Sequence, residues 1–526
     1  MEAGNLIGLD YGTLSARGVL VDAITGRVEA SHTHAYRHGV MNEALPDGAK
    51  LPPLWALQNA PDYTEAAEAI LSAIGRGKLV HGIGIGFTAS SPLPALADGT
   101  PLSMLHPSNP HAYVKLWKHQ AAQPWAARIN AAGGEFLRPF GGKLSAEWLL
   151  AKAAQIAEEA PELWVETDRF IEAGDWLVWT LTGNEVRSLG FAAYKAQYAP
   201  GIGYPDGIVS GLLDKLRDPL PAGRAAGGLT AAWRERTGIL GDAVIAVAII
   251  DSHVVMPAVG AIEPGTLVGA LGTSAVFLLL DDRARRLPFG IEGAAKDGVL
   301  PGLWCYEAGQ AAFGDTLDWF VRTFPRAPDP NRNFAEYNAA AAQLAPGENQ
   351  LVALDWWNGC RVPLGDSSLS GLLVGLNLRT TAGGIYRALL ESLSYGTRNI
   401  VEHLSAGGAP LNRILLTSGL AQKNPLLMQV MADVLGREIL VPQIDHATAV
   451  GAAIHGAVAA GVLGSYAEGA KRYGATSFLK YATERAAAAA YELLYKQYRA
   501  LGADASLRHV MHAIPGQCSQ AEIPSS

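Results

Sequence analysis

Residues 7–13 read Ile-Gly-Leu-Asp-Tyr-Gly-Thr, and residues 268–274 read Val-Gly-Ala-Leu-Gly-Thr-Ser. Each stretch joins an apolar strand to a second one, at 16–22 or 275–281, through a turn of glycine and hydroxyl residues. Such a turn directs backbone N–H groups and a hydroxyl at one point, as a polyphosphate requires. Either hairpin alone has an ordinary explanation, because glycine serves any tight turn. Their repetition about half a chain apart predicts two related domains that face one nucleotide.

The composition predicts a large folded protein with more than one domain. The chain has 526 residues, which exceeds the length at which a single hydrophobic core stops growing. Hydrophobic residues make up 49% and charged residues 17%, with a mean hydropathy of +0.12, as expected for sheets covered by helices on both faces. The net charge is -8, and no basic run exceeds the short cluster at 283–286, which is interpreted as a solvated turn. Bulk charge therefore gives no attraction to nucleic acid or anionic membranes.

The cysteines and the N-terminal residues predict a cytoplasmic protein. Cys305, Cys360 and Cys518 are odd in number, scattered and without CxxC spacing, which argues against a disulfide framework and a zinc ribbon. Asp10 interrupts the first strand, and the N-terminal sequence offers no basic region with an apolar core and a cleavage site. We therefore expect a reducing compartment and no secretion.

The most apolar long window, residues 243–262, is expected to be a buried strand at 243–250 followed by a helix. Asp251, His253 and Pro257 interrupt the window, and a membrane helix would tolerate them poorly. No membrane contact is therefore expected.

Other patterns indicate alternating strands and helices. Proline and acidic residues at 61–65 predict a helix start, and residues 80–86 predict a strand. The small polar turn at 88–92 follows that strand, where open α/β sheets place ligand contacts. Residues 111–185 are mostly helical by pattern, and the small residues of 447–457 predict a helix that can pack very closely on its neighbour.

Two carboxylates stand where phosphoryl chemistry can use them. Asp10 lies between the first strand and its turn, where it could hold magnesium through water beside β- and γ-phosphates, or bond its own turn. Asp251 ends the strand 246–250 and precedes an apolar stretch, so it could cap a helix. Asp251 is equally well placed as a general base that takes a proton from a substrate hydroxyl attacking phosphorus. These two roles of Asp251 do not exclude each other.

Longer motifs extend over nearly the whole chain, from Ile7 to about Leu501. They are Gly8-Leu9-Asp10-Tyr11-Gly12, His38-Gly39-Val40-Met41, Phe87-Thr88-Ala89, Lys115-Leu116-Trp117-Lys118-His119, Gly141-Gly142-Lys143-Leu144-Ser145-Ala146-Glu147-Trp148, Tyr194-Lys195, Tyr306-Glu307-Ala308-Gly309-Gln310, Leu354-Asp355-Trp356-Trp357-Asn358-Gly359 and Gln422-Lys423-Asn424. With these motifs the chain resembles the FGGY family of carbohydrate kinases, within the actin, hexokinase and Hsp70 superfamily. The first motif is shared across the superfamily, whereas the groups at 117–119, 307–310 and 355–359 are specific to members that phosphorylate L-ribulose.

The resemblance implies an α/β fold of two duplicated actin/hexokinase-like (ribonuclease H-like) ATPase domains around a central cleft. Residues 1–262 would form the N-terminal sugar-binding domain, and residues 263–505 the C-terminal nucleotide-binding domain. Residues 506–526 have little periodicity and are expected to form a loosely ordered tail.

The resemblance also implies an activity, which is the ATP-dependent phosphorylation of a ketopentose, L-ribulose to L-ribulose 5-phosphate in L-arabinose catabolism. Asp251 would be the base that activates the terminal hydroxyl of the sugar. The implied partners are the sugar, ATP and Mg²⁺, without nucleic acid or membrane, and a homodimer is a family-level expectation.

Site residues are carried over position by position. The sugar site would be lined by Ala89, Trp117, Lys195, Asp251 and Glu307. Phosphates would be held by Gly12, Thr13, Gly272, Thr273 and Ser274, with Asp10 positioning the magnesium ion; Ser418, Gly419 and Asn424 would lie near the α-phosphate and adenosine. The residue types suit a sugar, because its hydroxyls need charged and backbone partners and its C–H face can be covered by an indole. Structural alternatives are a surface lysine for Lys195, a helix-start acid for Glu307 and a core position for Trp117.

Three positions depart from the family pattern. Gly86 stands where relatives usually carry an acidic residue, which puts the choice of sugar in doubt. Ser418 replaces the first glycine of a common Gly-Gly pair, and Leu14 replaces a frequent hydroxyl. The alternatives are therefore a kinase for another pentulose or a polyol (D-ribulose, xylulose, ribitol or erythritol) and a catalytically weak regulator that binds sugar or nucleotide.

Overall fold

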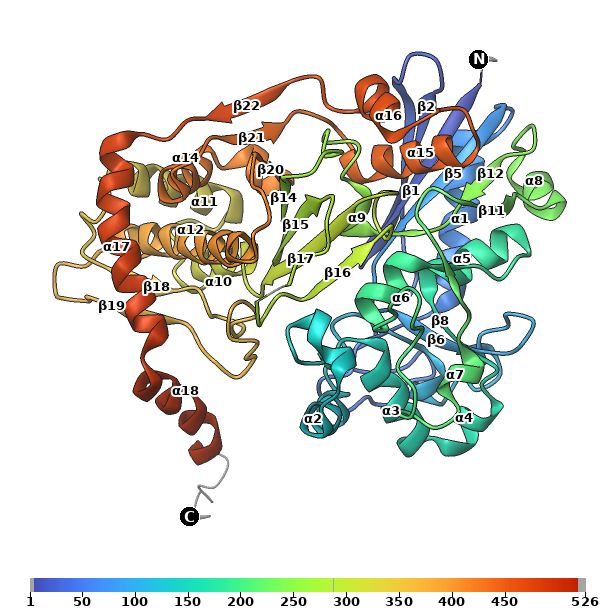
Figure 1. The fold of residues 1–526 in the computed structure, drawn as a ribbon, viewed down its shortest axis with the longest axis horizontal. Helices are drawn as coiled ribbons and strands as arrows, with labels where there is room; N and C mark the ends of the chain where they lie inside the picture. The colour runs from blue at the N-terminus through green and yellow to red at the C-terminus, as the bar shows by residue number, and fades with distance from the viewer. Residues whose placement is uncertain (1–3, 287, 519–526) are drawn as a thin grey trace.

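Two seven-stranded sheets form the frame of the molecule, and helices pack around them (Figure 1). The computed structural model describes residues 4–286 and 288–518. The first sheet has the order β11-β12-β5-β1-β2-β3, with β13 also paired to β5. Its strands are β1 (Asn5–Tyr11), β2 (Ser15–Asp22), β3 (Val28–Ala35), β5 (Val80–Phe87), β11 (Ala225–Gly228), β12 (Val244–Ala246) and β13 (Ile249–Ile250).

The second sheet repeats the central pattern of the first. Its order is β16-β17-β15-β14-β20-β21-β22. The strands are β14 (Thr266–Leu271), β15 (Ala275–Asp281), β16 (Gly293–Lys296), β17 (Trp304–Gln310), β20 (Arg413–Thr417), β21 (Ile439–Pro442) and β22 (Phe478–Tyr481). β1 pairs antiparallel with β2 and parallel with β5, just as β14 pairs antiparallel with β15 and parallel with β20. Both predicted hairpins and the duplicated α/β fold are thus confirmed.

Helices and short strands complete two lobes. The first lobe is built around the first sheet, and the second lobe is built around the second sheet. The helices are α1 (Ala60–Gly75), α2 (Gln123–Ala132), α3 (Leu149–Glu159), α4 (Pro161–Glu166), α5 (Ala173–Thr182), α6 (Leu189–Lys195), α7 (Leu212–Lys215), α8 (Ala231–Thr237), α9 (Asp251–Val254), α10 (Gly314–Thr323), α11 (Pro330–Ala342), α12 (Ala382–Ala406), α13 (Gly419–Lys423), α14 (Pro425–Leu435), α15 (Ala447–Ala459), α16 (Tyr466–Tyr473), α17 (Arg485–Ala503) and α18 (Ala505–Cys518). Short strand pairs are β4 (Leu57–Gln58) with β7 (Val114–Lys115), β6 (Pro92–Ala95) with β8 (Arg169–Glu172), β9 (Arg187–Ser188) with β10 (Pro219–Leu220), and β18 (Val352–Leu354) with β19 (Leu372–Val374).

Helix α15 packs at very short range on the first sheet, although it lies late in the chain. A Cβ atom added to Gly8 of β1 would lie 1.7 Å from the carbonyl oxygen of Ala449, and one added to Gly84 of β5 would lie 1.7 Å from that of Ala452. Only glycine permits this approach. The expected close packing of the small-residue helix is confirmed. Figure 1 shows α15 and α16 beside β1 and β5, so this part of 263–505 covers the first lobe.

Two expectations about secondary structure are wrong in part. The strand expected over 243–250 is interrupted, because β12 and β13 pair separately with β5, and the helix after it is the short α9. The expected loose tail is wrong for residues 505–518, which form α18. Leu507 and Met511, one helical turn apart, pack into a cluster with Tyr498 of α17 and hold α18 in place. Residues 519–526 of that expectation lie outside the described residues.

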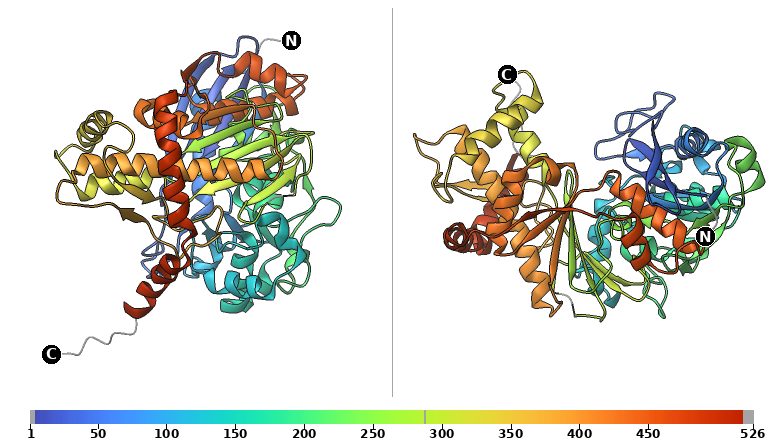
Figure 2. Two further views of the ribbon diagram at one scale, coloured as in Figure 1. Left: turned by 60° about the vertical axis from the view of Figure 1, so that its left-hand side comes forward. Right: turned by 90° about the horizontal axis from the view of Figure 1, so that it is seen from above.

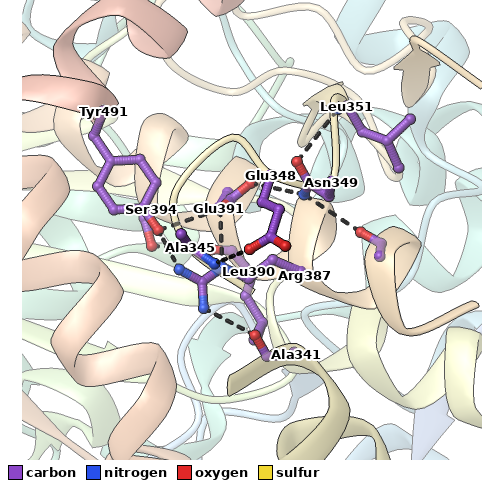
Figure 3. A network of polar contacts seen from close by, with 11 residues as sticks. Ala341, Ala345, Glu348, Asn349, Leu351, Arg387, Leu390, Glu391, Ser394 and Tyr491 are labelled. Carbon is purple, nitrogen blue, oxygen red and sulfur yellow. Dashed lines mark hydrogen bonds and ion pairs between the residues drawn. The ribbon is translucent and has the colours of Figure 1, made fainter. Parts of the chain in front are cut away.

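A buried polar network ties α12 to α17 in the second lobe (Figure 3). Arg387 pairs with Glu391 at 2.9 Å and donates to the hydroxyl of Tyr491 at 2.6 Å and to the carbonyl oxygen of Ala341 at 3.1 Å. Figures 1 and 2 show α17 on the far side of the second lobe from the first. The network therefore braces the outer part of this lobe.

No helix among residues 4–286 and 288–518 is long and apolar enough to span a membrane. Cys305 and Cys360 are buried free thiols.

Candidate active site

Asp10 and Asp251 meet at one edge of the first sheet. Gly86 of β5 pairs with Asp10 on one side and with Ile249 on the other, two residues before Asp251. Burial, followed by the charge of Asp10, raises the pKa of Asp251 to about 6. Burial also raises the pKa of Asp10, against the effect of a hydrogen bond of 2.5 Å from the hydroxyl of Thr448. The charge of Asp10 thus acts on Asp251 at this edge of the sheet.

The helix-cap explanation of Asp251 is wrong. Asp251 is the first residue of α9, and the cap position is taken by Ile250, which has no polar side chain. The carboxylate of Asp251 accepts only the neighbouring N–H of Ser252, at 2.7 Å, among the hydrogen bonds of the described residues. Its position at the strand end therefore leaves it able to accept a proton from a ligand.

Glu307, in β17 of the second lobe, binds two side chains of the first lobe. Its carboxylate lies 2.8 Å from Nζ of Lys195 at the end of α6 and 2.7 Å from Nε2 of His253 in α9. Burial opposes ionisation of Glu307, but Lys195 and His253 outweigh it and hold its pKa well below the usual range. The surface-lysine and helix-start alternatives are both wrong, because Lys195 is mostly buried and Glu307 lies inside β17.

His253 is a site residue that the sequence did not reveal. Burial lowers its pKa despite the nearby Glu307, so the ring is neutral and donates from Nε2. Its Nδ1 is buried without a hydrogen-bond partner among the described residues. In the sequence, His253 is one polar residue in an apolar window, and only the fold brings it to Glu307.

Trp117 and Ala89 lie near the first glycine turn. The indole nitrogen of Trp117 donates to the hydroxyl of Thr13 at 3.1 Å, and the indole is half-buried rather than a core side chain. Thr88, next to Ala89, bonds the carbonyl oxygen of Tyr11 through its N–H at 3.0 Å and its hydroxyl at 2.7 Å. The turn after β5 is therefore fixed to the turn after β1.

The two glycine turns have related geometry. The N–H of Gly12 bonds the carbonyl oxygen of Ser15 at 3.0 Å, and that of Gly272 bonds the carbonyl oxygen of Ser274 at 2.9 Å. These two N–H groups close their own turns, so they are not the free donors that the sequence predicted. Gly272 and Thr273 are exposed, and Ser274 is half-buried. The hydroxyls and the remaining N–H groups of both turns are the groups left for a phosphate.

The third predicted nucleotide segment begins with an unusual backbone at Ser418. Its φ of 143° and ψ of 175° belong to a region that essentially only glycine occupies. Its hydroxyl accepts the N–H of Ala421 at 3.3 Å, while the next residue, Gly419, is exposed. Asn424 is buried, caps α14 through the N–H of Leu427 at 3.0 Å, and donates to Asn338 at 3.2 Å. Asn424 thus stabilises the start of α14 and links it to Asn338 of α11.

Two of the specific motifs contact each other. Nε2 of Gln310 donates to Asp355 at 2.7 Å, and Asp355 also accepts the hydroxyl of Tyr498 at 2.7 Å. Burial raises the pKa of Asp355 to about 6. This contact fixes the end of β17, the strand that carries Glu307.

The departure at Gly86 has a steric counterpart. A Cβ atom at Gly86 would lie 2.8 Å from Cγ1 of Val254 in α9. An acidic side chain would therefore require the side chain of Val254, in the helix that begins at Asp251, to move. Leu14, the other departure in the first turn, is exposed.

The comparisons with known proteins point to one family. The description "FGGY family of carbohydrate kinases, C-terminal domain" matches residues 267–460. The chain is 42% identical over 525 residues to a ribulokinase of Halalkalibacterium halodurans, covering 94% of this chain and 93% of that protein. It is also 42% identical over 486 residues to a ribulokinase of Mycolicibacterium smegmatis, covering 87% and 86%.

Solved structures share the fold. A xylulose kinase from Rhodospirillum rubrum superposes with a TM-score of 0.83 at 23% identity and covers 97% of this chain and 100% of that one. A glycerol kinase from Plasmodium falciparum with ADP gives a TM-score of 0.77 at 13% identity, with 94% and 97% covered. At such identities these likenesses concern the fold alone.

Proposed function

Since the chain belongs to the FGGY family of carbohydrate kinases, we propose that it transfers a phosphoryl group from ATP to L-ribulose and forms L-ribulose 5-phosphate. Relatives named ribulokinase match most of the chain, which supports this substrate over the other sugars of the family. The observation that carries the proposal is the pairing of Glu307 with Lys195 and His253 beside Asp251. We place the activity in the cytoplasm, where ATP is found, as part of L-arabinose catabolism.

Asp251 would act as the general base. Its pKa of about 6 leaves it ionised at neutral pH and more basic than an ordinary aspartate. It would take the proton of the terminal sugar hydroxyl as the hydroxyl oxygen attacks the γ-phosphorus and the bond to ADP breaks.

Lys195 and Glu307 would bind other hydroxyls of the sugar. Lys195 has further N–H donors beyond the one that contacts Glu307, and Glu307 is a fixed acceptor because two side chains hold it. Ala89 and Trp117 would cover the remaining sides of the sugar, the indole over the C–H face. Closure of the two lobes around the sugar would exclude water and suppress ATP hydrolysis.

The nucleotide would be held by the glycine turns. Gly12, Thr13, Gly272, Thr273 and Ser274 would surround the phosphates, with Ser418, Gly419 and Asn424 nearer to adenosine. Mg²⁺ suits Asp10, because this ion takes one or two carboxylates together with water and phosphates, and one oxygen of Asp10 has no hydrogen-bond partner among the described residues. When bound, Mg²⁺ would neutralise charge on the β- and γ-phosphates.

The proposal is tested by ADP production with Mg-ATP and a panel of L-ribulose, D-ribulose, both xyluloses, ribitol, erythritol and glycerol. Preference for L-ribulose supports it. Preference for another sugar would keep the kinase mechanism and reassign the substrate. Binding without turnover of any sugar would favour the regulatory alternative, and sedimentation of the same preparation would test the expected homodimer.

A further inference from the structure

A buried lysine outside the site described above connects two segments that carry sugar-site residues. Lys152 of α3 has no solvent exposure. Its ammonium group donates to three carbonyl oxygens: that of Ser90 at 2.6 Å, that of Leu116 at 2.9 Å and that of Lys115 at 3.2 Å. Ser90 follows Ala89, and Leu116 precedes Trp117. One ammonium therefore fixes the distance between the backbones next to Ala89 and Trp117.

The side chain of Glu172 holds the other end of the same peptide bond. The carbonyl group of Ser90 and the N–H group of Ser91 belong to one peptide unit. Lys152 binds its oxygen, and Glu172, the last residue of β8, accepts its N–H at 2.8 Å. The peptide unit is thus held at both ends, by Lys152 at its oxygen and by Glu172 at its N–H group.

This turn needs such support because its backbone is strained. Ser90 has a φ of 59°, in the left-handed region that non-glycine residues seldom occupy. A strained conformation persists when its surroundings determine it. Ser90 and Ser91 are both buried, so water cannot replace the contacts with Lys152 and Glu172.

From this geometry we infer that Lys152, with Glu172, is a positioning pair that sets the spacing of Ala89 and Trp117 and thereby the affinity for the sugar. Neither side chain touches the sugar itself; both act through the backbone of the two segments. The inference rests on the proposed function, because Ala89 and Trp117 line a sugar site only under that proposal.

The test compares two buried lysines. Lys152→Met keeps the length of the side chain and removes the ammonium. Lys115→Met is the matched control, because Lys115 is equally buried but its Nζ has no hydrogen-bond partner among the described residues and lies 4.2 Å from the ring centre of Trp55. We expect K152M to raise the KM for the sugar about tenfold or more, because small displacements in a site are costly. The KM for ATP should stay within about twofold, and K115M should leave both constants within that range.

The outcomes separate positioning from simple instability. A loss of folded protein lowers the apparent kcat without changing the KM for the sugar. An unchanged sugar KM in folded K152M would overturn the inference, as would an equal rise in K115M. If K152M does not fold, Glu172→Met decides: it keeps the length of the side chain but removes the acceptor of the Ser91 N–H group, and a sugar KM equal to that of the wild type would overturn the inference.

Assays of the wild-type protein distinguish a failure of this inference from a failure of the proposed function. If it neither phosphorylates nor binds, by calorimetry, any sugar of the panel, the proposed function fails and the inference fails with it. If the wild type works on a sugar and K152M and Glu172→Met match it, the proposed function stands and the inference alone is wrong.

Discussion

Burial and, after it, the nearby carboxylate of Asp10 raise the pKa of Asp251, because both residues lie where neighbouring strands of the first sheet end. Asp251 must be ionised to accept a proton. We therefore expect kcat/KM to rise with pH through about 6 and to fall about tenfold per pH unit below that value. A pH profile of kcat/KM for the sugar measures this directly.

The variant Asp10→Asn identifies the source of the shift. It removes the negative charge next to Asp251, so in the protein without Mg²⁺ and nucleotide the pKa of Asp251, measured from the pH dependence of thermal stability, should be lower than in the wild type. An unchanged pH dependence would show that the charge of Asp10 does not act on Asp251.

Asp251→Asn should separate catalysis from stability. Loss of a general base lowers kcat by about 10²–10⁴, while binding of ATP without sugar should change little. The folded protein raises the pKa of Asp251 from 3.8 to about 6, so the protonated form is favoured by folding. That contribution is complete below pH 3.8 and is lost as the pH rises through about 6.

The asparagine variant stays neutral at every pH. We expect it to melt at a higher temperature than the wild type at pH 8, with a smaller difference at pH 5. Thermal denaturation of both proteins at the two pH values provides the measurement. A difference in melting temperature that does not depend on pH would mean that folding does not raise the pKa of Asp251.

The sequence predicts local features of this fold better than long-range ones. The two hairpins and α15 are visible in it because glycines and apolar strands are contiguous patterns. The roles of His253 and Thr448 are not, because each depends on a partner from a distant segment, Glu307 and Asp10 respectively. Helix α18 was missed because tertiary packing, rather than its own periodicity, holds it in place.

Ser418→Gly should stabilise the protein. Ser418 has a φ of 143°, a conformation that costs a non-glycine residue about 1–3 kcal/mol. Glycine removes this strain, but its unfolded chain gains about 0.4–1 kcal/mol of conformational freedom and the hydroxyl cap of Ala421 is lost. We expect a net gain of about 1 kcal/mol in the free energy of unfolding by urea. The KM for ATP should be no higher than in the wild type.

Ser418→Ala is the control for that gain. It also loses the hydroxyl but keeps a Cβ atom in the strained conformation, so it should be less stable than the wild type by about 0.5–1 kcal/mol. Equal stabilities of the glycine and alanine variants would argue against backbone strain at this position.

Arg387 and Glu391 form a buried ion pair within α12 of the second lobe (Figure 3). Both side chains are buried, at 5% and 1% exposure, so Arg387→Met leaves the carboxylate of Glu391 without a cation and with only the neutral donors Asn349 and Tyr491. Breaking such a pair costs about 3–5 kcal/mol, whereas replacing both partners by apolar residues is often nearly neutral. We therefore expect R387M to lower the free energy of unfolding strongly and R387M/E391L to recover most of it. Urea denaturation of the three proteins tests this, and a double variant no more stable than R387M would show that Tyr491 and Ala341, rather than the charge of Glu391, account for the loss.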